Sequence, residues 1–419
     1  MPARKLVTPA LILALFTASL AACGAEAQKN GDVGRHRTGA STTTGARSAD
    51  DVLPPPATPV QLQKCQDDLK LQFAEAIAPP PVAQATDVAL HDSTAAPRAD
   101  APAAAKPAST DDKHGKGVRG KAAPAAPPKT HYRQSTDPFF AVKMGWPVRT
   151  PALLPGAILP CHRIVAYYGN PFSRRMGVLG EYPYPDMIKR FQAAVAMWNA
   201  ADPGHPVQPA LQLISVVAQG APGDDGMYRL RMPASLIDKV YGWARQEHAL
   251  FIMDVQVGKS TVQAELPRLE PYLKNPDVML AIDPEFSMHY QADGSKPGQK
   301  IGVMSAADIN FASGLLEQIV QKYHLPPKIL IVHRFTRRMV QNSRDIRLRP
   351  DVQIVVNMDG WGAEWLKRDS YHDYIIEEPV EYTGFKIFYH NDVRKAGWSL
   401  MTPAQVLQFR PYPLYIQYQ

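Results

Sequence analysis

Eight short apolar runs recur along this chain from residue 162 onward, and they constrain its fold more than any other feature. Their hydrophobicity is continuous rather than alternating, which is typical of parallel strands that are covered on both faces. Stretches with helical spacing separate them. The runs occupy residues 162–168, 211–217, 249–257, 278–283, 328–333, 352–358, 384–390 and 413–418.

Helices are expected between these runs, with clear helical spacing in "MIKRFQAAVAMW" and "ADINFASGLLEQIVQKY". Asp186 is a candidate N-cap after Pro185, and Ser305 with Asp308 resembles a capping box. The expected helices span residues 185–200, 233–247, 261–273, 306–324, 362–374 and 403–409.

Strands that alternate with helices predict an α/β fold, specifically a (β/α)8 TIM-type barrel over residues 136–419. An open doubly wound sheet is the alternative. Such a sheet favours a Gly-x-Gly-x-x-Gly turn after its first strand, whereas this chain has "YYGNPFSRR" there. The sequence therefore favours the barrel.

The first 22 residues have the features of an export signal: a basic start, a short apolar core and small residues before Cys23. The core is shorter than the roughly 20 apolar residues of a comfortable membrane span. Leu20 to Cys23 resembles a bacterial lipobox, and this resemblance implies cleavage before Cys23 and a lipid, such as palmitate, on its sulfur. Gly24 favours the outer membrane. A lipid-anchored envelope protein facing the periplasm or exterior is expected; a plain secretory signal is the alternative.

Residues 23–135 are rich in Ala, Pro, Ser and Thr and carry few large apolar side chains. This composition predicts a disordered tether, because it buries too little surface to offset chain entropy. A short amphipathic segment at 60–77 contains Cys65. Outside the cytoplasm, Cys65 and Cys161 form a candidate disulfide, with two unpaired thiols as the alternative.

The formal net charge of +7 is not gathered into a dense basic run, so a nucleic-acid partner is not expected. We expect a monomer with no cofactor and no metal. His333 and His390 alone are a thin metal signal, and no Gly-x-Ser-x-Gly nucleophile turn is present.

Acidic residues follow several of the predicted strands, where the chemistry of TIM barrels is located. The catalytic candidates are Asp254, Asp283, Glu285 and Asp359. Alternate strand residues point the same way and neighbouring strands lie about 4.8 Å apart, so the first three are expected to cluster. Crowding of carboxylates raises the pKa of at least one of them.

Loop capping, or pairing with Arg174, Arg334 or Arg337, is the alternative role for these acids. Polar and aromatic residues near the same strand ends are candidate substrate contacts, and Trp365 and Trp398 are further candidate platforms for sugar rings. The candidate contacts are Tyr168, Asn170, Gln256, His333, Asn357, Trp361, Tyr389, Asn391, Asp392 and Gln417.

An Asp-x-Glu after the fourth barrel strand, here Asp283 and Glu285, resembles the TIM-barrel glycoside hydrolases, notably the family 18 chitinases and family 25 muramidases. The resemblance implies a carbohydrate substrate and Glu285 as general acid, with Asp283 orienting it or polarising an N-acetyl group. Val278 and Ala281 stand where the chitinase pattern has aspartates. A catalytically inactive barrel that binds a glycan or a protein at the cell surface is therefore the alternative.

Overall fold

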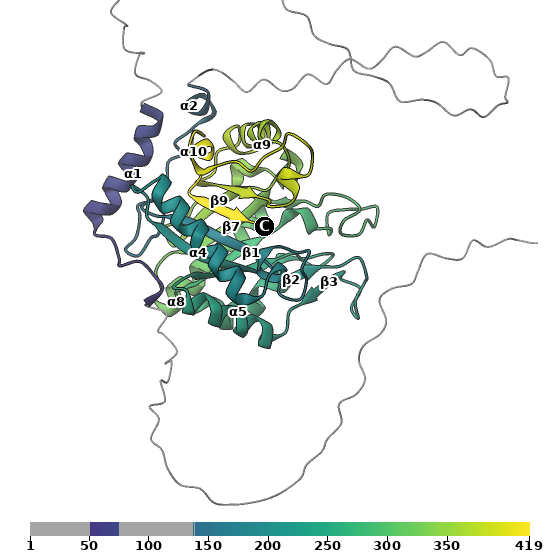
Figure 1. Ribbon diagram of the computed structural model, residues 1–419. Coiled ribbons are helices and arrows are strands. Elements are labelled where there is room, and N and C mark those ends of the chain that lie inside the picture. Colours follow the sequence, from purple (N-terminus) through teal and green to yellow (C-terminus); the bar gives the residue numbers. More distant parts are fainter. Residues whose placement is uncertain (1–50, 75–136, 138) are drawn as a thin grey trace, which may run out of the picture. The chain divides into compact units, whose positions relative to one another are not determined.

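A computed structural model describes residues 51–74, 137 and 139–419 and shows a closed barrel of eight parallel strands (Figure 1). The barrel closes because β1 pairs in parallel with both β2 and β11. The predicted (β/α)8 barrel is confirmed, and the open sheet is excluded. The barrel strands are β1 (Arg163–Gly169), β2 (Val207–Ala218), β4 (Leu250–Val255), β5 (Val278–Ile282), β7 (Lys328–Arg334), β9 (Val352–Met358), β10 (Tyr382–Ile387) and β11 (Tyr415–Tyr418).

Three short strands lie outside the closed barrel. β3 (Arg229–Arg231) pairs antiparallel with the end of β2, and β6 (Met304–Ser305) pairs with β8 (Val340–Gln341).

The longer helices lie outside the ring of strands (Figure 1). They are α4 (Tyr184–Ala201), α5 (Ala234–Gln246), α8 (Ala306–Tyr323) and α9 (Glu364–Tyr371), with α2 (Phe140–Met144), α3 (Val178–Glu181) and α10 (Pro403–Val406) as short additions. The capping interaction before α8 is confirmed, since Asp308 accepts a hydrogen bond from the Ser305 N–H at 2.9 Å. Asp186 is not an N-cap, because α4 begins at Tyr184 and Asp186 lies in its first turn.

Three predicted helices are shorter or less regular than expected. The helix predicted over 261–273 is divided into α6 (Val262–Glu265), a 3-10 turn and α7 (Glu270–Leu273), because Pro267 and Pro271 lack the N–H that a continuous helix requires. α9 continues as a π-helical turn, and α10 ends before residue 407. The 3-10 and π turns are Leu266–Leu269, Pro284–Phe286, Arg337–Met339, Ser343–Asp345, His372–Ile376 and Asn391–Val393.

Two apolar layers hold the barrel together. One lies between the strands and the helices, and the other fills the barrel interior from alternate, inward-pointing strand residues. The inner layer includes Ile164, Ala166, Ala210, Leu250, Ile252, Met279, Ala281, Ile329, Ile331 and Val355. The next inward positions toward the carboxyl ends of the strands carry polar side chains, so the interior changes from apolar to charged along the barrel axis.

The segment 51–74 packs on the barrel through α1 (Pro59–Ala74). Phe73 stacks on Trp146 with ring centroids 6.5 Å apart, and Gln72 Oε1 accepts a hydrogen bond from the Tyr412 N–H at 2.8 Å. The structure joins Cys65 to Cys161 in a disulfide with a Cα–Cα distance of 5.2 Å. The structure also places residues 51–58, which precede the expected amphipathic segment, and Val52 among them is buried.

The predicted signal segment, Cys23 and the rest of the predicted tether lie outside the described residues. Among the helices that the structure describes, none is both long and apolar enough to cross a membrane.

Candidate active site

A cavity of about 620 Å³ lies at the carboxyl ends of the barrel strands. Loop residues and inward-pointing strand residues line it together, as expected for the end of a TIM barrel that carries chemistry. Its lining includes Tyr168, Gln256, Asp283, Glu285, Phe335, Asp359, Trp361, Lys386, Phe388 and the C-terminal Gln419.

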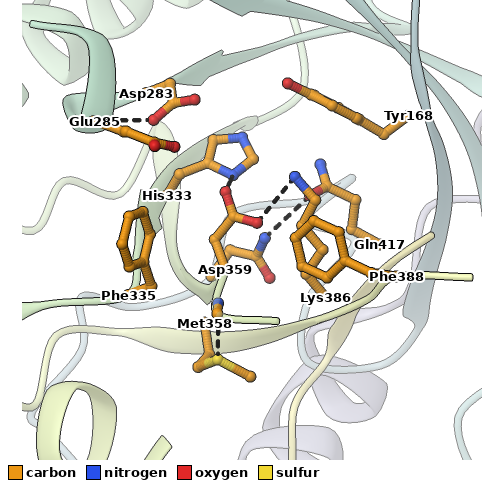
Figure 2. Close-up of polar contacts among 12 residues, drawn as sticks. Tyr168, Asp283, Glu285, His333, Phe335, Met358, Asp359, Lys386, Phe388 and Gln417 are labelled. Carbon is orange, nitrogen blue, oxygen red and sulfur yellow. Dashed lines mark hydrogen bonds and ion pairs between the residues drawn. The ribbon is translucent and has the colours of Figure 1, made fainter. Parts of the chain in front are cut away.

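The turn that follows β5 presents two of the four predicted carboxylates. β5 ends at Ile282, and Asp283 caps the 3-10 turn Pro284–Phe286 by accepting a hydrogen bond from the Glu285 N–H at 3.0 Å. The prediction that Asp283 and Glu285 share one strand face is therefore wrong, because Glu285 belongs to the turn. Figure 2 nevertheless shows both carboxyl groups on the same side of the site.

Gly302 holds this turn in place from the following loop. Its N–H donates to the Glu285 carbonyl at 2.6 Å. A Cβ on residue 302 would lie 2.5 Å from the Pro284 carbonyl oxygen, so a larger residue would push the loop off the turn.

The surroundings of both carboxyl groups on this turn favour their protonated forms. Burial raises the pKa of Asp283 to about 7, with the His333 charge opposing this rise and the Asp254 charge adding to it. Burial raises the pKa of Glu285 to about 8, and the charges of Asp283 and Asp359 raise it further. These two groups interact, so they titrate as a pair.

Asp359, which follows β9, is held in the opposite charge state. Burial opposes its ionisation, but the charges of Lys386 and His333 outweigh burial and lower the pKa of Asp359. Lys386 Nζ lies 2.9 Å from Asp359 Oδ1, and His333 Nδ1 lies 3.0 Å from Oδ2 (Figure 2). Asp359 therefore remains a carboxylate at a pH where Glu285 carries a proton.

His333 links Asp359 to a deeper acid. Its Nε2 lies 2.8 Å from Asp254 Oδ2, and burial of the ring is outweighed by the charges of Asp254 and Asp359, which raise the pKa of His333 to about 10. Asp254 is fully buried and also accepts a hydrogen bond from Gln212 Nε2 at 2.5 Å. Asp254 therefore lies beneath the cavity and does not join Asp283 and Glu285 on its wall.

Three predicted contact residues, Tyr168, Gln256 and Trp361, line the cavity. Gln256 Nε2 lies 3.4 Å from the Tyr168 hydroxyl and 3.5 Å from Asp283 Oδ2. Burial and the nearby carboxylates raise the pKa of Tyr168 well above 10.0, so its hydroxyl stays neutral. Trp361 stands at the edge of the cavity with 43% of its surface exposed.

Predicted contacts Asn357 and Gln417 lie within the barrel, where the Asn357 amide donates to Gln417 Oε1 at 3.4 Å. Asn170 is buried and donates to the Ile214 carbonyl at 3.1 Å, while the Tyr389 hydroxyl pairs with that of Tyr167 at 2.9 Å. None of these four lines the cavity, because each is directed into the protein.

Asn391 and Asp392 also stand apart from the cavity lining. Asp392 is buried and accepts hydrogen bonds from the Gly362 N–H at 2.9 Å and from Lys367 Nζ at 2.7 Å. It supports the loop that carries Trp361, so its role in the site is indirect.

The arginines that were alternative partners for the acids are engaged elsewhere. Arg334 pairs with Glu378 at 2.5 Å, and Arg337 pairs with Glu377 and Glu378. Arg174 forms no ion pair within the described part of the chain. The cavity acids are therefore not held by these arginines.

Sequence reasoning missed Lys386, Gln212, Phe335 and Phe388. For Lys386 a signal exists in "GFKIFYH", because a lysine inside an apolar strand is almost never buried without a partner. Lys386 Nζ lies 4.1 Å from the centre of the Tyr168 ring as well as beside Asp359. The aromatic residues carry no such signal, because their spacing is that of ordinary core residues.

The described residues contain one group with metal-binding geometry: His372, Asp373 and Glu377. Arg337 forms an ion pair with Glu377, and its positive charge disfavours a metal ion at this position. In the cavity, the charges of His333 and Lys386 balance that of Asp359.

Comparison of the chain with protein-family models and with curated proteins gives no match, so the chemistry of the site carries the functional argument.

Proposed function

We propose that this protein is a glycoside hydrolase in which Glu285 donates a proton to the leaving oxygen of a glycosidic bond. The observation that carries the proposal is the opposite charge state of two carboxyls in one cavity. Burial raises the pKa of Glu285 to about 8, whereas Lys386 and His333 lower that of Asp359 against the effect of burial. One protonated and one ionised carboxyl are the requirement for general acid catalysis of glycoside cleavage.

In this mechanism Asp359 supplies the negative charge that an oxocarbenium-like transition state requires. Water adds to the sugar carbon in place of the leaving oxygen, and the proton that it releases restores the acid form of Glu285. Asp283 positions Glu285 through the hydrogen bond to its N–H at 3.0 Å and, when ionised, favours the protonated form of Glu285. The Gln256 amide and the Tyr168 hydroxyl offer hydrogen bonds to sugar hydroxyls, and Trp361, Phe335 and Phe388 offer apolar surface. The substrate is a polysaccharide of the cell envelope or the environment.

We also propose, from the sequence, that a lipid on Cys23 anchors the enzyme in the cell envelope. The disulfide between Cys65 and Cys161 supports this placement, because disulfides persist in oxidising compartments outside the cytoplasm.

The alternative is a barrel that binds a glycan without cleaving it. Val278 and Ala281, at positions where the related chitinase pattern has aspartates, favour this alternative. Hydrolysis of peptidoglycan and chitin oligosaccharides by the wild type and by Glu285→Gln separates the two. The proposal expects a loss of about 10²–10⁴-fold in kcat for Glu285→Gln, the usual contribution of general acid catalysis. Binding by the wild type without hydrolysis would support the alternative.

A further inference from the structure

A second hollow of about 370 Å³ lies beside the candidate active site, and its walls carry two tryptophans. Trp365 is 47% exposed, and Trp398 is half-buried. The polar groups of Glu364, Arg368 and Ser399 stand around them. Large aromatic side chains with nearby hydrogen-bonding groups are typical of ligand sites.

Helix α9 forms the wall that separates this hollow from the catalytic cavity. Leu366 and Ser370 line the cavity, whereas Trp365 and Arg368 line the hollow. Residues 366 and 370 are one turn apart on one face, and 365 and 368 share the opposite face. A helix is about 10 Å across, so a chain of a few linked sugar rings spans the wall.

Three of the four tryptophans that are not buried lie on this side of the barrel, and the fourth, Trp243, lies on α5. Trp361 stands at the cavity edge, Trp365 follows it on α9, and Trp398 faces the hollow. In contrast, Trp146 and Trp198 are buried in the core. Several large aromatic side chains gathered on one accessible side are more informative than one exposed residue, because such groups are typical of ligand sites.

The polar groups of the hollow are pre-organised. Arg368 Nη2 donates to Glu364 Oε1 at 2.7 Å, and Gln405 Nε2 donates to Glu364 Oε2 at 2.9 Å. This pairing balances the charges of Arg368 and Glu364 and keeps donors and acceptors fixed beside the rings, while Lys395 Nζ lies 5.0 Å from the centre of the Trp398 ring. A ligand rich in hydroxyls finds both donors and acceptors there.

We propose that the Trp365–Trp398 hollow is a distal subsite that holds a glycan chain extending from the catalytic cavity. The pyranose ring fits it because its axial C–H groups form an apolar face for tryptophan while its rim carries hydroxyls. The inference rests on the proposed function in taking the ligand to be a glycan. It adds that the substrate is an extended polymer and not a short oligosaccharide.

The test is sedimentation of the full chain with insoluble chitin and with peptidoglycan sacculi. Trp365→Ala and Trp398→Ala are each expected to weaken binding of at least one polysaccharide by about tenfold, which is within the usual cost of truncating a binding tryptophan. Trp365→Tyr keeps an aromatic face and should retain most of the affinity. Trp243→Ala is the matched control, because Trp243 packs on Tyr184 and lines neither cavity.

The subsite would be overturned if both alanine variants bound the polysaccharides as tightly as the wild type. It would also be overturned if the wild type bound neither polysaccharide. A wild type that binds through Trp365 and Trp398 but hydrolyses nothing would overturn the proposed catalysis and leave the subsite standing. Thermal unfolding of each variant confirms that a lost affinity is not a lost fold.

Discussion

At the scale of single residues, neighbours determine which carboxyl of this site carries a proton. Asp359 is buried between Lys386 and His333, and these cations keep it ionised. No ion pair joins Glu285 to any residue that the structure describes, so burial dominates and its pKa rises to about 8. The same functional group thus has opposite charge states within one cavity.

The raised pKa of Glu285 predicts a pH-dependent gain in stability for Glu285→Gln. The pKa of Glu285 is about 8 in the folded protein and about 4.5 in the unfolded chain, so the carboxyl ionises more easily in the unfolded chain. The free energy of unfolding of the wild type therefore falls as the pH rises from about 4.5 to 8. The variant should match the wild type at pH 4 and exceed it at pH 9. Denaturant unfolding at both values measures the difference, with Asp224→Asn, an exposed loop acid, as control. A variant less stable than the wild type at pH 9 would contradict the assignment.

His333→Gln should destabilise the protein by about 3–5 kcal/mol at pH 6, because it leaves Asp254 and Asp359 without their shared cation. His333 has a folded pKa of about 10 against an ordinary 6.5, so its contribution is complete below pH 6.5 and is lost as pH rises to 10. The difference in the free energy of unfolding between wild type and variant, measured with urea, should therefore become smaller from pH 6 to pH 10.

His390→Gln is the matched control for this comparison. His390 lies on the surface beside Glu181, and its replacement should change stability by less than about 0.5 kcal/mol. If His333→Gln lowers the free energy of unfolding as much at pH 10 as at pH 6, the His333 ring is not held in its charged form.

At the scale of elements, the strands were predictable and the ends of the strands were not. Continuous hydrophobicity indicated all eight barrel strands, because both faces of each strand are buried. The alternation of strand side chains gave a wrong position for Glu285, because β5 ends just before Asp283, which caps the following turn. It also could not show that Asp254 lies below the cavity or that Lys386 pairs with Asp359. Those placements depend on the depth of each residue along the barrel axis, which one strand's pattern does not reveal.

The disulfide predicts that α1 stabilises the barrel. It joins residues 96 positions apart, and the loss of a native disulfide from a small extracellular domain typically costs about 2–5 kcal/mol. Cys65→Ser with Cys161→Ser should lower the thermal midpoint. The double variant should also expose α1 to proteolysis, because only non-covalent contacts, including those of Phe73 and Gln72, then hold it on the barrel. An unchanged midpoint and an uncut α1 would show that packing suffices.

For the whole molecule, the proposed export signal and the proposed lipid on Cys23 predict where the barrel works. Cys23→Ser should move the protein from the membrane fraction to the soluble fraction, because it removes the sulfur to which the proposed lipid would be attached. Immunoblotting of fractionated cells measures this, and Cys65→Ser is the matched cysteine control, expected to stay with the membrane. Unchanged fractionation of Cys23→Ser would contradict lipid anchoring.

The pH dependence of kcat/KM for hydrolysis of a chitin or peptidoglycan oligosaccharide shows whether Glu285 acts as the general acid. We expect a plateau below about pH 7 and an alkaline limb at about 7–8, where the Asp283–Glu285 pair loses its proton. The acid limb should lie below 3.8, because Lys386 and His333 outweigh burial and keep Asp359 ionised. An alkaline limb near 4.5, or the same profile in Glu285→Gln, would contradict the assignment of Glu285 as the general acid.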